Sequence, residues 1–331
     1  MRAQLLKKAG NIADRPLEFA DIADPVPGPG ELLLSVSACG VCRTDLQICE
    51  GDLAARTLPI VPGHQAVGRV SGVGAGVDGW SVGDRAGVGW LGSTCGTCDL
   101  CRRGLENLCE EARFTGWDRN GGFATGMTVA SDFAFPLPLG AGDLDVAPLL
   151  CGGVIGYRAL KVSGIEPGGR LGLYGFGASA LLAIQVALHW GCEVFVVTRS
   201  AREMRRALEM GAVWAGGYDD TPPVGLQAAV TFAPVGSVVV AALSALERGG
   251  VVAVNAIHLD EVPAFPYEKL WWERHIRSVA NFTRADAREF LALAAELPIR
   301  TVVDDYPLAE ANQALADLQA GMVSGAAVLE I

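Results

Sequence analysis

The hydrophobic positions of the chain follow two different patterns. Over roughly the first 150 residues, apolar segments are short and are separated by Gly, Pro and other turn residues, with the clearest runs at Glu31–Ala38, Val67–Val73 and Arg85–Trp90. Short apolar runs between turn signals are typical of strands in an irregular, β-rich domain. From Arg170 onward, apolar runs alternate with longer helical patterns. The pattern therefore predicts two architectures in one chain, with the change near Cys151.

The alternating part predicts a parallel sheet covered by helices on both faces, because strands joined through helices run in the same direction. Its strands are expected at Leu171–Tyr174, Glu193–Thr198, Ala229–Phe232 and Val251–Ala256, and its helices at Ala178–Trp190, Ala201–Met210 and in a stretch ending at Leu246. The tail predicts a helix at Ala285–Glu296, a strand, a helix near Glu310–Ala320 and a final strand at Gly325–Ile331. The expected fold class is α/β, a doubly wound parallel sheet joined to a β-rich domain.

Length and charge narrow the possible functions. A chain of 331 residues suggests about two domains, and the formal net charge of −11 is not offset by any basic run, so we expect no nucleic-acid partner. Met1–Gly10 lacks the apolar core of a signal peptide, and Pro234 and Gly236 interrupt the most apolar stretch, Ala228–Leu246. We therefore expect a buried strand and a helix in that stretch, no membrane span, and a cytoplasmic protein.

Nine cysteines in a chain without a recognisable export signal favour metal binding or catalysis over disulfides. Four of them lie within fifteen residues: Cys95, Cys98, Cys101 and Cys109. Two-residue gaps let a tight turn present successive sulfurs to one ion, and the longer gap lets the chain return with the fourth. Zinc binds four thiolates in a tetrahedron, and such a closed site is structural. An iron–sulfur cluster and four unliganded cysteines are the alternatives.

A second metal site is expected from three residues far apart in the sequence. Cys42, His64 and Cys151 lie in the local sequences CGVCRTD, VPGHQ and LLCGG. Taken singly, each would more often be a structural residue. Together, two thiolates and one imidazole leave one position of tetrahedral zinc open, as catalytic zinc sites do. An open zinc acts as a Lewis acid on an alcohol oxygen, lowers its pKa and favours the departure of a hydride.

A glycine-rich turn predicts a dinucleotide site. Gly175, Gly177 and Ala180 occupy the three small positions of G-x-G-x-x-G/A, directly after a predicted strand and at the start of the next helix. Gly175 permits the tight turn, and Gly177 lets the backbone approach a pyrophosphate, which the helix N-terminus attracts. Ala178 and Ser179, at the start of that helix, are expected to contact the cofactor too.

The end of the next strand bears on the choice of nicotinamide cofactor. Enzymes that bind NAD(H) usually place Asp or Glu there, where it bonds the ribose 2′-hydroxyl. This chain has Thr198, Arg199 and Ser200 instead, and of these Arg199 and Ser200 can hold a 2′-phosphate. We therefore expect NADP(H) to be favoured and NAD(H) to remain possible, the alternative being that Arg199 is a solvated surface charge. Ala256 and Ile257, at the end of a later strand, are also expected to contact the cofactor.

Taken together, these motifs resemble those of the zinc-containing medium-chain dehydrogenase/reductase superfamily, which includes the alcohol dehydrogenases. The stretches LPIVPGHQAVGRV, LYGFGASA, RSVANFTRADAREFLALAAE and AAVLEI are similar to the bacterial cinnamyl-alcohol-dehydrogenase-like group. The resemblance implies a GroES-like catalytic domain at residues 1–152 and 285–331 and a Rossmann nucleotide-binding domain at residues 153–284, with the active site in the cleft between them. It also implies two Zn²⁺ ions per chain, one catalytic and one structural.

The resemblance further implies roles for residues around the open zinc site. Arg43 would face the cofactor pyrophosphate, Thr44 would pass the substrate proton outward, and Asp45 would orient the zinc-bound imidazole. Trp90 would line the substrate pocket, although an aromatic side chain packed in the core is an equal alternative. The loops that would shape this pocket lie near Phe114, Trp117 and His258–Trp272.

Three positions depart from the family pattern. Gln65 follows the zinc-binding histidine where many relatives carry Glu, and Gln47 stands where many place His at the outer end of a proton relay. Ser324 stands where relatives often have Arg for the pyrophosphate. Because Gln neither titrates nor supplies negative charge, we expect the proton to leave through ordered water. We also expect the cofactor pyrophosphate to be bound more weakly, or to be bound by Arg43 instead.

The expected function is hydride transfer between a nicotinamide cofactor and a small-molecule alcohol or aldehyde. The alternatives are an NADPH-dependent carbon–carbon double-bond reductase of the same fold and a non-catalytic, zinc-stabilised nucleotide-binding protein. The family implies a homodimer or homotetramer. We expect Val251–Ala256 and the segment after it to pair sheet edges across a two-fold axis. Trp271 and Trp272 would then be buried at that interface or in the core.

Overall fold

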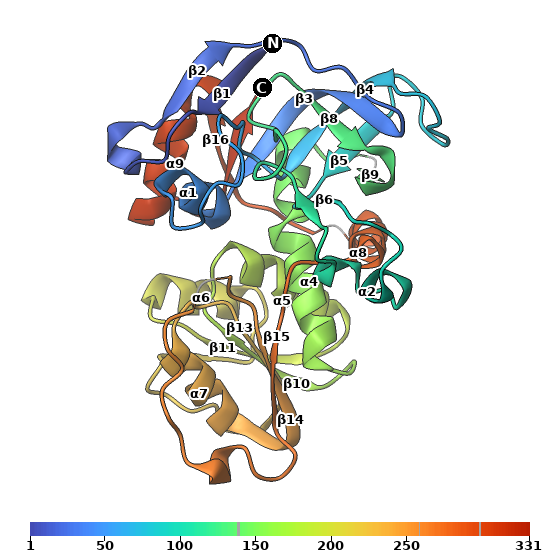
Figure 1. The fold of residues 1–331 in the computed structure, drawn as a ribbon. Helices are drawn as coiled ribbons and strands as arrows, with labels where there is room; N and C mark the ends of the chain where they lie inside the picture. Colours follow the sequence, from blue (N-terminus) through green and yellow to red (C-terminus); the bar gives the residue numbers. More distant parts are fainter. Residues whose placement is uncertain (138–139, 258, 298) are drawn as a thin grey trace. The chain divides into compact units, whose positions relative to one another are not determined.

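The computed structural model describes residues 1–137, 140–257, 259–297 and 299–331 (Figure 1). The chain forms two compact units. The first consists of Met1–Cys151 together with Asn281–Ile331, and the second of Gly152–Ala280. Both ends of the described chain thus belong to the first unit, whereas the second unit is one continuous segment.

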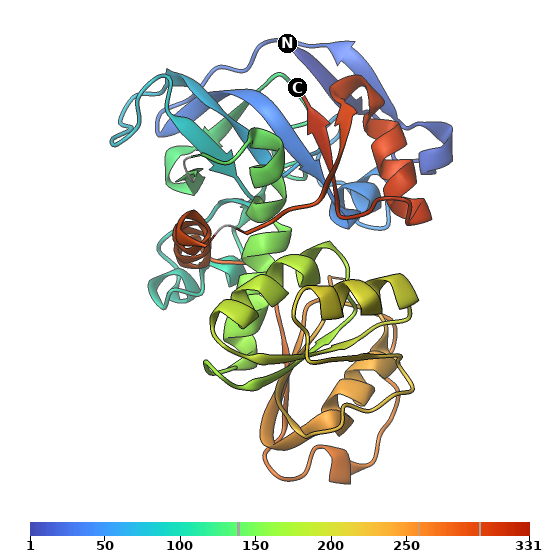
Figure 2. The same ribbon diagram turned by 180° about the vertical axis from the view of Figure 1, so that it is seen from behind.

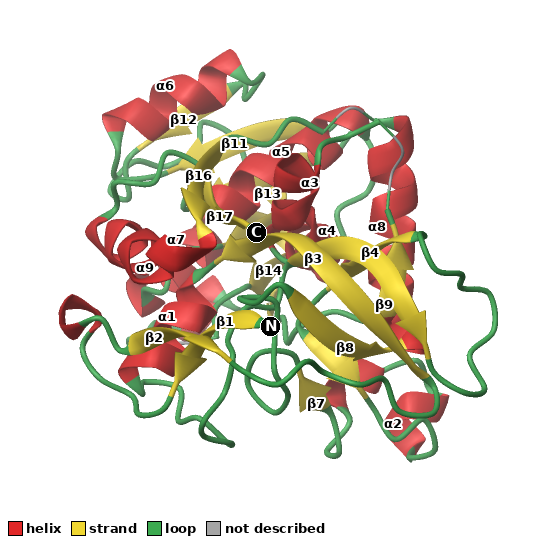
Figure 3. Ribbon diagram, turned by 90° about the horizontal axis from the view of Figure 1, so that it is seen from above, coloured by secondary structure: helices red, strands yellow, loops and turns green. Residues whose placement is uncertain are grey.

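The first unit is built on a seven-stranded sheet with the order β16-β17-β3-β4-β5-β9, in which β8 also pairs with β3. These strands are β3 (Glu31–Val41), β4 (Ala66–Val73), β5 (Arg85–Val88), β8 (Gly126–Ala130), β9 (Ala134–Pro136), β16 (Val303–Pro307) and β17 (Ala326–Glu330). Strand β3 pairs antiparallel with β4, β8 and β17. Strands from opposite ends of the sequence therefore lie side by side in one sheet (Figure 3).

Burial along β3 follows from its alternating sequence. Leu32, Leu34 and Ala38 are fully buried, whereas Ser35 is exposed. Successive side chains of a strand point to opposite faces of the sheet. Over its first half, β3 therefore has one face in the core and one face that is more exposed to solvent. From Cys39 onward every residue of β3 is buried. The last residues of β3, directly before Cys42, are therefore buried in the interior of the unit.

The first unit also contains two further pairs of strands and several helices. They are β1 (Arg2–Leu6), β2 (Leu17–Asp21), β6 (Leu91–Ser93), β7 (Arg113–Phe114), α1 (Arg43–Glu50), α2 (Asp99–Arg102), α3 (Asp143–Val146), η4 (Ala147–Leu150), α8 (Arg284–Glu296) and α9 (Ala311–Ala320). Strands β1 and β2 form one two-stranded sheet, and β6 and β7 form another. The predicted tail helices and the final strand are thus present in this unit.

The second unit is a six-stranded sheet with the order β12-β11-β10-β13-β14-β15, and every neighbouring pair is parallel. Its elements are β10 (Arg170–Tyr174), β11 (Glu193–Val197), β12 (Trp214–Gly216), β13 (Leu226–Thr231), β14 (Leu246–Val254), β15 (His275–Ser278), α4 (Gly152–Ser163), α5 (Ala178–His189), α6 (Ala201–Glu209) and α7 (Gly236–Ala245). Helices α5 and α6 lie on one face of the sheet and α7 on the other (Figure 2). The predicted doubly wound parallel sheet is confirmed.

One prediction about this sheet is wrong. Strand β14 does not lie at the edge, because it pairs with β13 on one side and with β15 on the other. The edge is β15, all four residues of which are exposed. Trp271 and Trp272 are 51% and 48% exposed, so neither is part of the core.

The chain has a hydrophobic core in each unit. In the described parts of the chain, no helix is both long enough and apolar enough to cross a membrane. The stretch Ala228–Leu246 instead divides between β13, α7 and the first residue of β14, as the interrupting proline and glycine predict.

Candidate functional site

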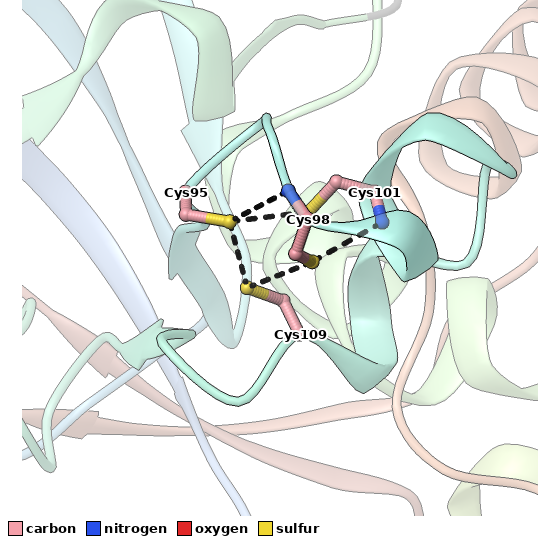
Figure 4. A group of neighbouring side chains, drawn as sticks. All are labelled: Cys95, Cys98, Cys101 and Cys109. Atoms are coloured by element: carbon pink, nitrogen blue, oxygen red, sulfur yellow. Dashed lines mark hydrogen bonds between the residues drawn. The ribbon is translucent and has the colours of Figure 1, made fainter.

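Cys95, Cys98, Cys101 and Cys109 turn their sulfur atoms toward one another (Figure 4). The Sγ–Sγ distances are 3.9 Å from Cys95 to Cys101, 3.6 Å from Cys109 to Cys95 and 4.0 Å from Cys98 to Cys109. A tetrahedron of four thiolates around zinc, with bonds of about 2.3 Å, has edges of roughly 3.8 Å. A disulfide requires about 2.05 Å, so the cysteines are not paired covalently. The geometry fits one tetrahedral metal ion.

Backbone amides support this four-cysteine site. The amide of Cys98 donates to Cys95 Sγ at 3.3 Å, and the amide of Cys101 donates to Cys98 Sγ at 3.5 Å, which starts helix α2. Hydrogen bonds from the amides of Thr97 and Cys98 lower the pKa of Cys95 to about 6. Burial and the neighbouring sulfur of Cys98 raise the pKa of Cys101 to about 12. A metal ion would hold all of these sulfurs as thiolates.

Cys42, His64 and Cys151 form a second group, although they come from three separate segments. Cys42 follows β3 and is the N-cap of α1, His64 precedes β4, and Cys151 follows η4. Their ligand atoms all lie within 4.8 Å of one another, and Cys42 Sγ is 3.2 Å from His64 Nε2. Two sulfurs and one imidazole nitrogen suit zinc and leave one tetrahedral position for another ligand.

Asp45 connects two members of this group. Its Oδ1 accepts from the Gly63 amide at 3.1 Å and lies 3.0 Å from His64 Nδ1, while its Oδ2 accepts from the Cys42 amide at 2.9 Å. The last bond is half of a capping box that fixes the start of α1. Because Nδ1 is engaged by Asp45, Nε2 is the nitrogen presented to the sulfurs. The carboxylate thus orients the imidazole and anchors the ligand-bearing turn.

The electrostatics of the group favour a thiolate at Cys42. A hydrogen bond from Cys151 is the main reason that the pKa of Cys42 lies well below its ordinary value. The same hydrogen bond, with burial, raises the pKa of Cys151. Burial disfavours the charged form of His64, but Asp45 and Cys42 outweigh it and raise the pKa of His64. Burial also raises the pKa of Asp45, although His64 opposes that effect.

Three aromatic side chains, Trp90, Phe114 and Trp117, pack against one another beside His64. Trp90 meets the imidazole edge to face with ring centroids 4.9 Å apart. Trp90 also stacks on Phe114 and Trp117, at 5.2 Å and 5.8 Å between ring centroids. The guanidinium of Arg56 lies 3.8 Å from the ring centroid of Trp117 and 5.7 Å from that of Phe114, so a positive charge covers this aromatic cluster. Trp90 therefore contacts a candidate metal ligand, which the core alternative alone does not predict.

The structure also places Arg43, Thr44 and the three residues that depart from the family pattern. Of the latter, Gln47 is half-buried in α1. Gln65 is buried against Gly40, where an added Cβ would meet its Oε1 at 2.7 Å, so the glycine makes room for the amide. Thr44 is buried beside Cys42, and its amide donates to Cys42 Sγ at 3.3 Å. Arg43 is exposed. Ser324 is also exposed, and its amide donates to Asp304 at 2.6 Å.

The second unit has a cavity of about 500 Å³ at the carboxyl ends of its strands, which we call the nucleotide cavity. Of the expected cofactor residues, the cavity is lined by Gly175, Thr198, Arg199 and Ser200. Gly175 has φ +88°, a conformation that favours glycine. The other expected residues are not among the described lining: Arg43, Gly177, Ala178, Ser179, Ala256 and Ile257. His258, in the expected substrate loop, lies outside the described residues.

Sequence reasoning missed five residues of the nucleotide cavity: Phe176, Glu203, Tyr218, Ala233 and Pro234. Glu203 and Tyr218 are the two with ionisable side chains. The pKa of Tyr218 is raised, mainly by burial. The positive charge of Arg199 opposes this shift, and the negative charge of Glu203 adds to it. Both charges therefore lie close to the same phenol. The pattern Ser200-x-x-Glu203 is a helix-start signature, and it was the signal that could have placed an acid beside the strand end.

Comparison with known proteins covers the whole chain. Residues 28–139 match the alcohol dehydrogenase GroES-like domain, and residues 178–296 match the zinc-binding dehydrogenase domain. A probable alcohol dehydrogenase of Mycobacterium tuberculosis is 50% identical and aligns with 100% of this chain and 97% of its own length. An alcohol dehydrogenase of Geobacillus stearothermophilus is 33% identical, with 96% and 97% coverage. The structure of a cinnamyl alcohol dehydrogenase of Sorghum bicolor is similar at a TM-score of 0.89, with 25% identity and 99% and 97% coverage.

These matches agree with the architecture of the two units. The fold is a GroES-like β unit combined with a Rossmann-like parallel sheet, as the sequence predicts. The similarity extends over both units at 50% identity, well beyond any single motif. The chain belongs to the zinc-type medium-chain alcohol dehydrogenase family.

Proposed function

We propose that the chain is a zinc-dependent dehydrogenase that transfers a hydride between a nicotinamide cofactor and an alcohol or aldehyde. The observation that carries this proposal is the convergence of Cys42, His64 and Cys151, which offer three ligand atoms within 4.8 Å. Three protein ligands are typical of catalytic zinc, which keeps one position for water or substrate. The relatives named above are alcohol dehydrogenases, and they favour neither a double-bond reductase nor a non-catalytic protein.

In this proposal, Cys42, His64 and Cys151 hold the catalytic zinc, which when bound supplies Lewis-acid polarisation of the substrate oxygen. Asp45 keeps the imidazole of His64 in the tautomer that presents Nε2. The hydroxyl of Thr44 accepts the hydrogen bond of the substrate hydroxyl and passes its proton toward solvent. Trp90 shields this side of the ligand group from water.

We propose a second, structural zinc at Cys95, Cys98, Cys101 and Cys109. Support comes from four sulfurs at tetrahedral spacing and from amide hydrogen bonds to two of them. The same spacing in an iron–sulfur cluster would give a coloured protein, whereas zinc is colourless. Elemental analysis of the purified protein is expected to give two zinc ions and no iron per chain.

We propose that the second unit binds the nicotinamide cofactor and that the first unit carries out catalysis. Arg199 and Ser200, which line the nucleotide cavity, favour NADP(H) over NAD(H) by offering a charge and a hydroxyl to a 2′-phosphate. Gly177 supports this placement, because an added Cβ would meet nothing within 4 Å and the backbone is open to approach. A comparison of kcat/KM for NADPH and NADH tests the preference, and a clear advantage for NADH would contradict it.

The experiment for the overall proposal compares two cysteine variants. Cys42→Ala is expected to lose one of two zinc ions and essentially all turnover on a panel of alcohols and aldehydes. Cys192→Ala is the matched control, because Cys192 is buried in the second unit outside both cysteine groups. It is expected to keep both ions and full activity. Full turnover by Cys42→Ala would refute the proposed role of this zinc.

We further propose that the protein forms a homodimer or homotetramer and works in the cytoplasm. The exposed edge strand β15 supports the first point, because an unpaired edge offers backbone groups to a second copy. The free cysteines support the second, because a reducing compartment keeps thiols available to metal.

A further inference from the structure

The nucleotide cavity carries two opposite charges, and their effect on a bound nucleotide rests on the proposed nicotinamide cofactor. Arg199 and Glu203 both line the cavity, together with Thr198 and Ser200. The positive charge of Arg199 attracts a ligand phosphate, whereas the negative charge of Glu203 repels it. The choice between NADP(H) and NAD(H) therefore does not depend on Arg199 alone.

Two hydrogen bonds hold Glu203 at this position. Helix α6 begins after Ser200, whose hydroxyl accepts from the Glu203 amide at 3.3 Å. In a capping box the acid at this position turns back to the N-cap amide. Here its Oε2 instead accepts a hydrogen bond from the hydroxyl of Thr198. The amide of Thr198 donates to Gly216 O at 2.9 Å, which fixes Thr198 beside β12.

Thr198 directly follows Val197, the last residue of β11. The hydrogen bond from Thr198 therefore places the Glu203 carboxylate at the carboxyl end of this strand. Dinucleotide-binding folds that use NAD(H) place an acid at this strand end to bond the ribose 2′-hydroxyl. In this chain the acid comes from the following helix. The helix N-terminus also stabilises its negative charge, and the bond from Thr198 leaves carboxylate lone pairs for a ligand hydroxyl.

We propose that Glu203 is a cofactor-specificity residue that works against Arg199. Its carboxylate accepts a hydrogen bond from the ribose 2′-hydroxyl of NAD(H) and repels the 2′-phosphate of NADP(H). Arg199 attracts that phosphate. The preference for NADP(H) is consequently smaller than Arg199 by itself would give, and the chain uses both cofactors.

The test is a binding measurement on the full zinc-loaded protein, so it does not depend on turnover. Isothermal titration at pH 7.5 compares ADP-ribose with 2′-phospho-ADP-ribose, two probes that differ only by the phosphate. Glu203→Gln keeps the size of the side chain and removes its charge. We expect this variant to raise the affinity ratio in favour of the phosphorylated probe roughly tenfold. Arg199→Ala is expected to lower the same ratio by a similar factor.

Two matched variants separate a local effect from a general one. Glu209→Gln removes the same charge from the exposed last residue of α6, outside the cavity lining, and is expected to change the ratio by less than about twofold. Glu203→Asp keeps the charge, and its ratio is expected to stay closer to that of the wild type than to that of Glu203→Gln.

The outcomes divide clearly. A ratio for Glu203→Gln within twofold of the wild type overturns the role of Glu203 while leaving the proposed dehydrogenase function intact, and so does an equal shift in Glu209→Gln. Failure of the wild type to bind either probe refutes the proposed cofactor, and this inference with it. A tenfold shift confined to Glu203→Gln supports it.

Discussion

Asp45 is the residue on which the candidate catalytic site depends most, apart from the ligands themselves. It accepts hydrogen bonds from the amides of Cys42 and Gly63 and contacts His64 Nδ1, and it is fully buried. An amide side chain cannot replace it, because one of its two ends would present N–H groups to another donor. The carboxylate is therefore matched to three donors at once.

Asp45→Asn is predicted to weaken zinc binding at the proposed catalytic site by about 10- to 100-fold, the usual cost of losing a partner of a metal-bound histidine. Competition with a chelator, followed by zinc analysis, measures the affinity. Asp52→Asn serves as control, because Asp52 is exposed just after the same helix. Equal zinc retention by both variants would show that Asp45 does not support the metal.

Asp143 gives a prediction about pH. Burial favours its neutral form, but a hydrogen bond from Ser37 and the charge of Arg85 outweigh this and lower the pKa of Asp143. A carboxyl with a lowered folded pKa stabilises the fold above its unfolded pKa near 4, and that contribution is lost as pH falls through the folded value. Asp143→Asn has no such dependence.

We therefore expect the wild type to be more stable than Asp143→Asn near neutral pH, with the difference shrinking below about pH 4. Urea unfolding midpoints at several pH values between 3 and 7 measure this difference. A gap that is the same at every pH would mean that the charge of Asp143 does not contribute.

Among single residues, the sequence predicted which cysteine and histidine side chains come together better than it predicted the lining of the nucleotide cavity. Cysteine spacing and the contexts of Cys42, His64 and Cys151 constrain which atoms meet, because few arrangements of thiolates and imidazoles are compatible with one ion. Glu203 was missed because strand-end rules look for an acid on the strand, whereas this side chain returns from the next helix. Such a return depends on one rotamer, which the sequence pattern does not reveal.

Among the elements, α8 is tied to the segment between Cys101 and Cys109. Arg284, the first residue of α8, donates from its backbone amide to Glu106 Oε1 at 2.8 Å and from Nη2 to Glu106 Oε2 at 2.7 Å. The side chains are only 10% exposed for Glu106 and 26% for Arg284. Buried charge-assisted bonds of this kind contribute more than surface pairs.

Glu106→Gln is predicted to lower the free energy of unfolding by about 2 kcal/mol, because it removes the charge from a largely buried pair. Lys7→Gln, which breaks the exposed pair of Lys7 and Glu18, is predicted to cost less than about 0.5 kcal/mol. Denaturant unfolding of both variants provides the comparison. Similar losses in the two would mean that burial adds nothing to the Glu106–Arg284 bond.

The elements that the sequence predicted were those with a clear apolar or amphipathic run between turn residues. Helices α5 and α8 were predicted nearly residue by residue, but β15 was missed because His275–Ser278 has one apolar residue and no alternation to detect. Strand β14 begins earlier than expected, since Glu247, Arg248 and two glycines interrupt its apolar run. Pairing with a neighbouring strand, which is a tertiary effect, made these segments extended.

For the whole molecule, the unpaired edge of the second unit predicts self-association. Strand β15 pairs only on its β14 side within the described chain, and Tyr267, Trp271 and Trp272 nearby are about half exposed or more. A two-fold axis would let two copies of β15 pair and cover these rings. Light scattering after size exclusion is expected to give at least twice the chain mass.

Ile276→Lys places a charge in the middle of β15 and is predicted to shift the protein toward monomer. Val82→Lys adds the same charge at an exposed position of the first unit and is expected to leave the mass unchanged. A dimeric Ile276→Lys protein with unchanged dissociation on dilution would rule out this edge as the contact.

The pairing of β17 with β3 has a consequence for biosynthesis. Cys42, His64 and Cys151 are all translated before the second unit begins, yet β17, which lies beside β3 in the sheet that carries Cys42, starts only at Ala326. Roughly 175 residues separate Cys151 from Ala326, which is on the order of 10 to 35 seconds of ribosome time. During that interval, the side of β3 that pairs with β17 in the folded protein lacks this partner strand. We therefore expect the second unit to fold first and the proposed catalytic zinc to be bound only after β17 has been synthesised.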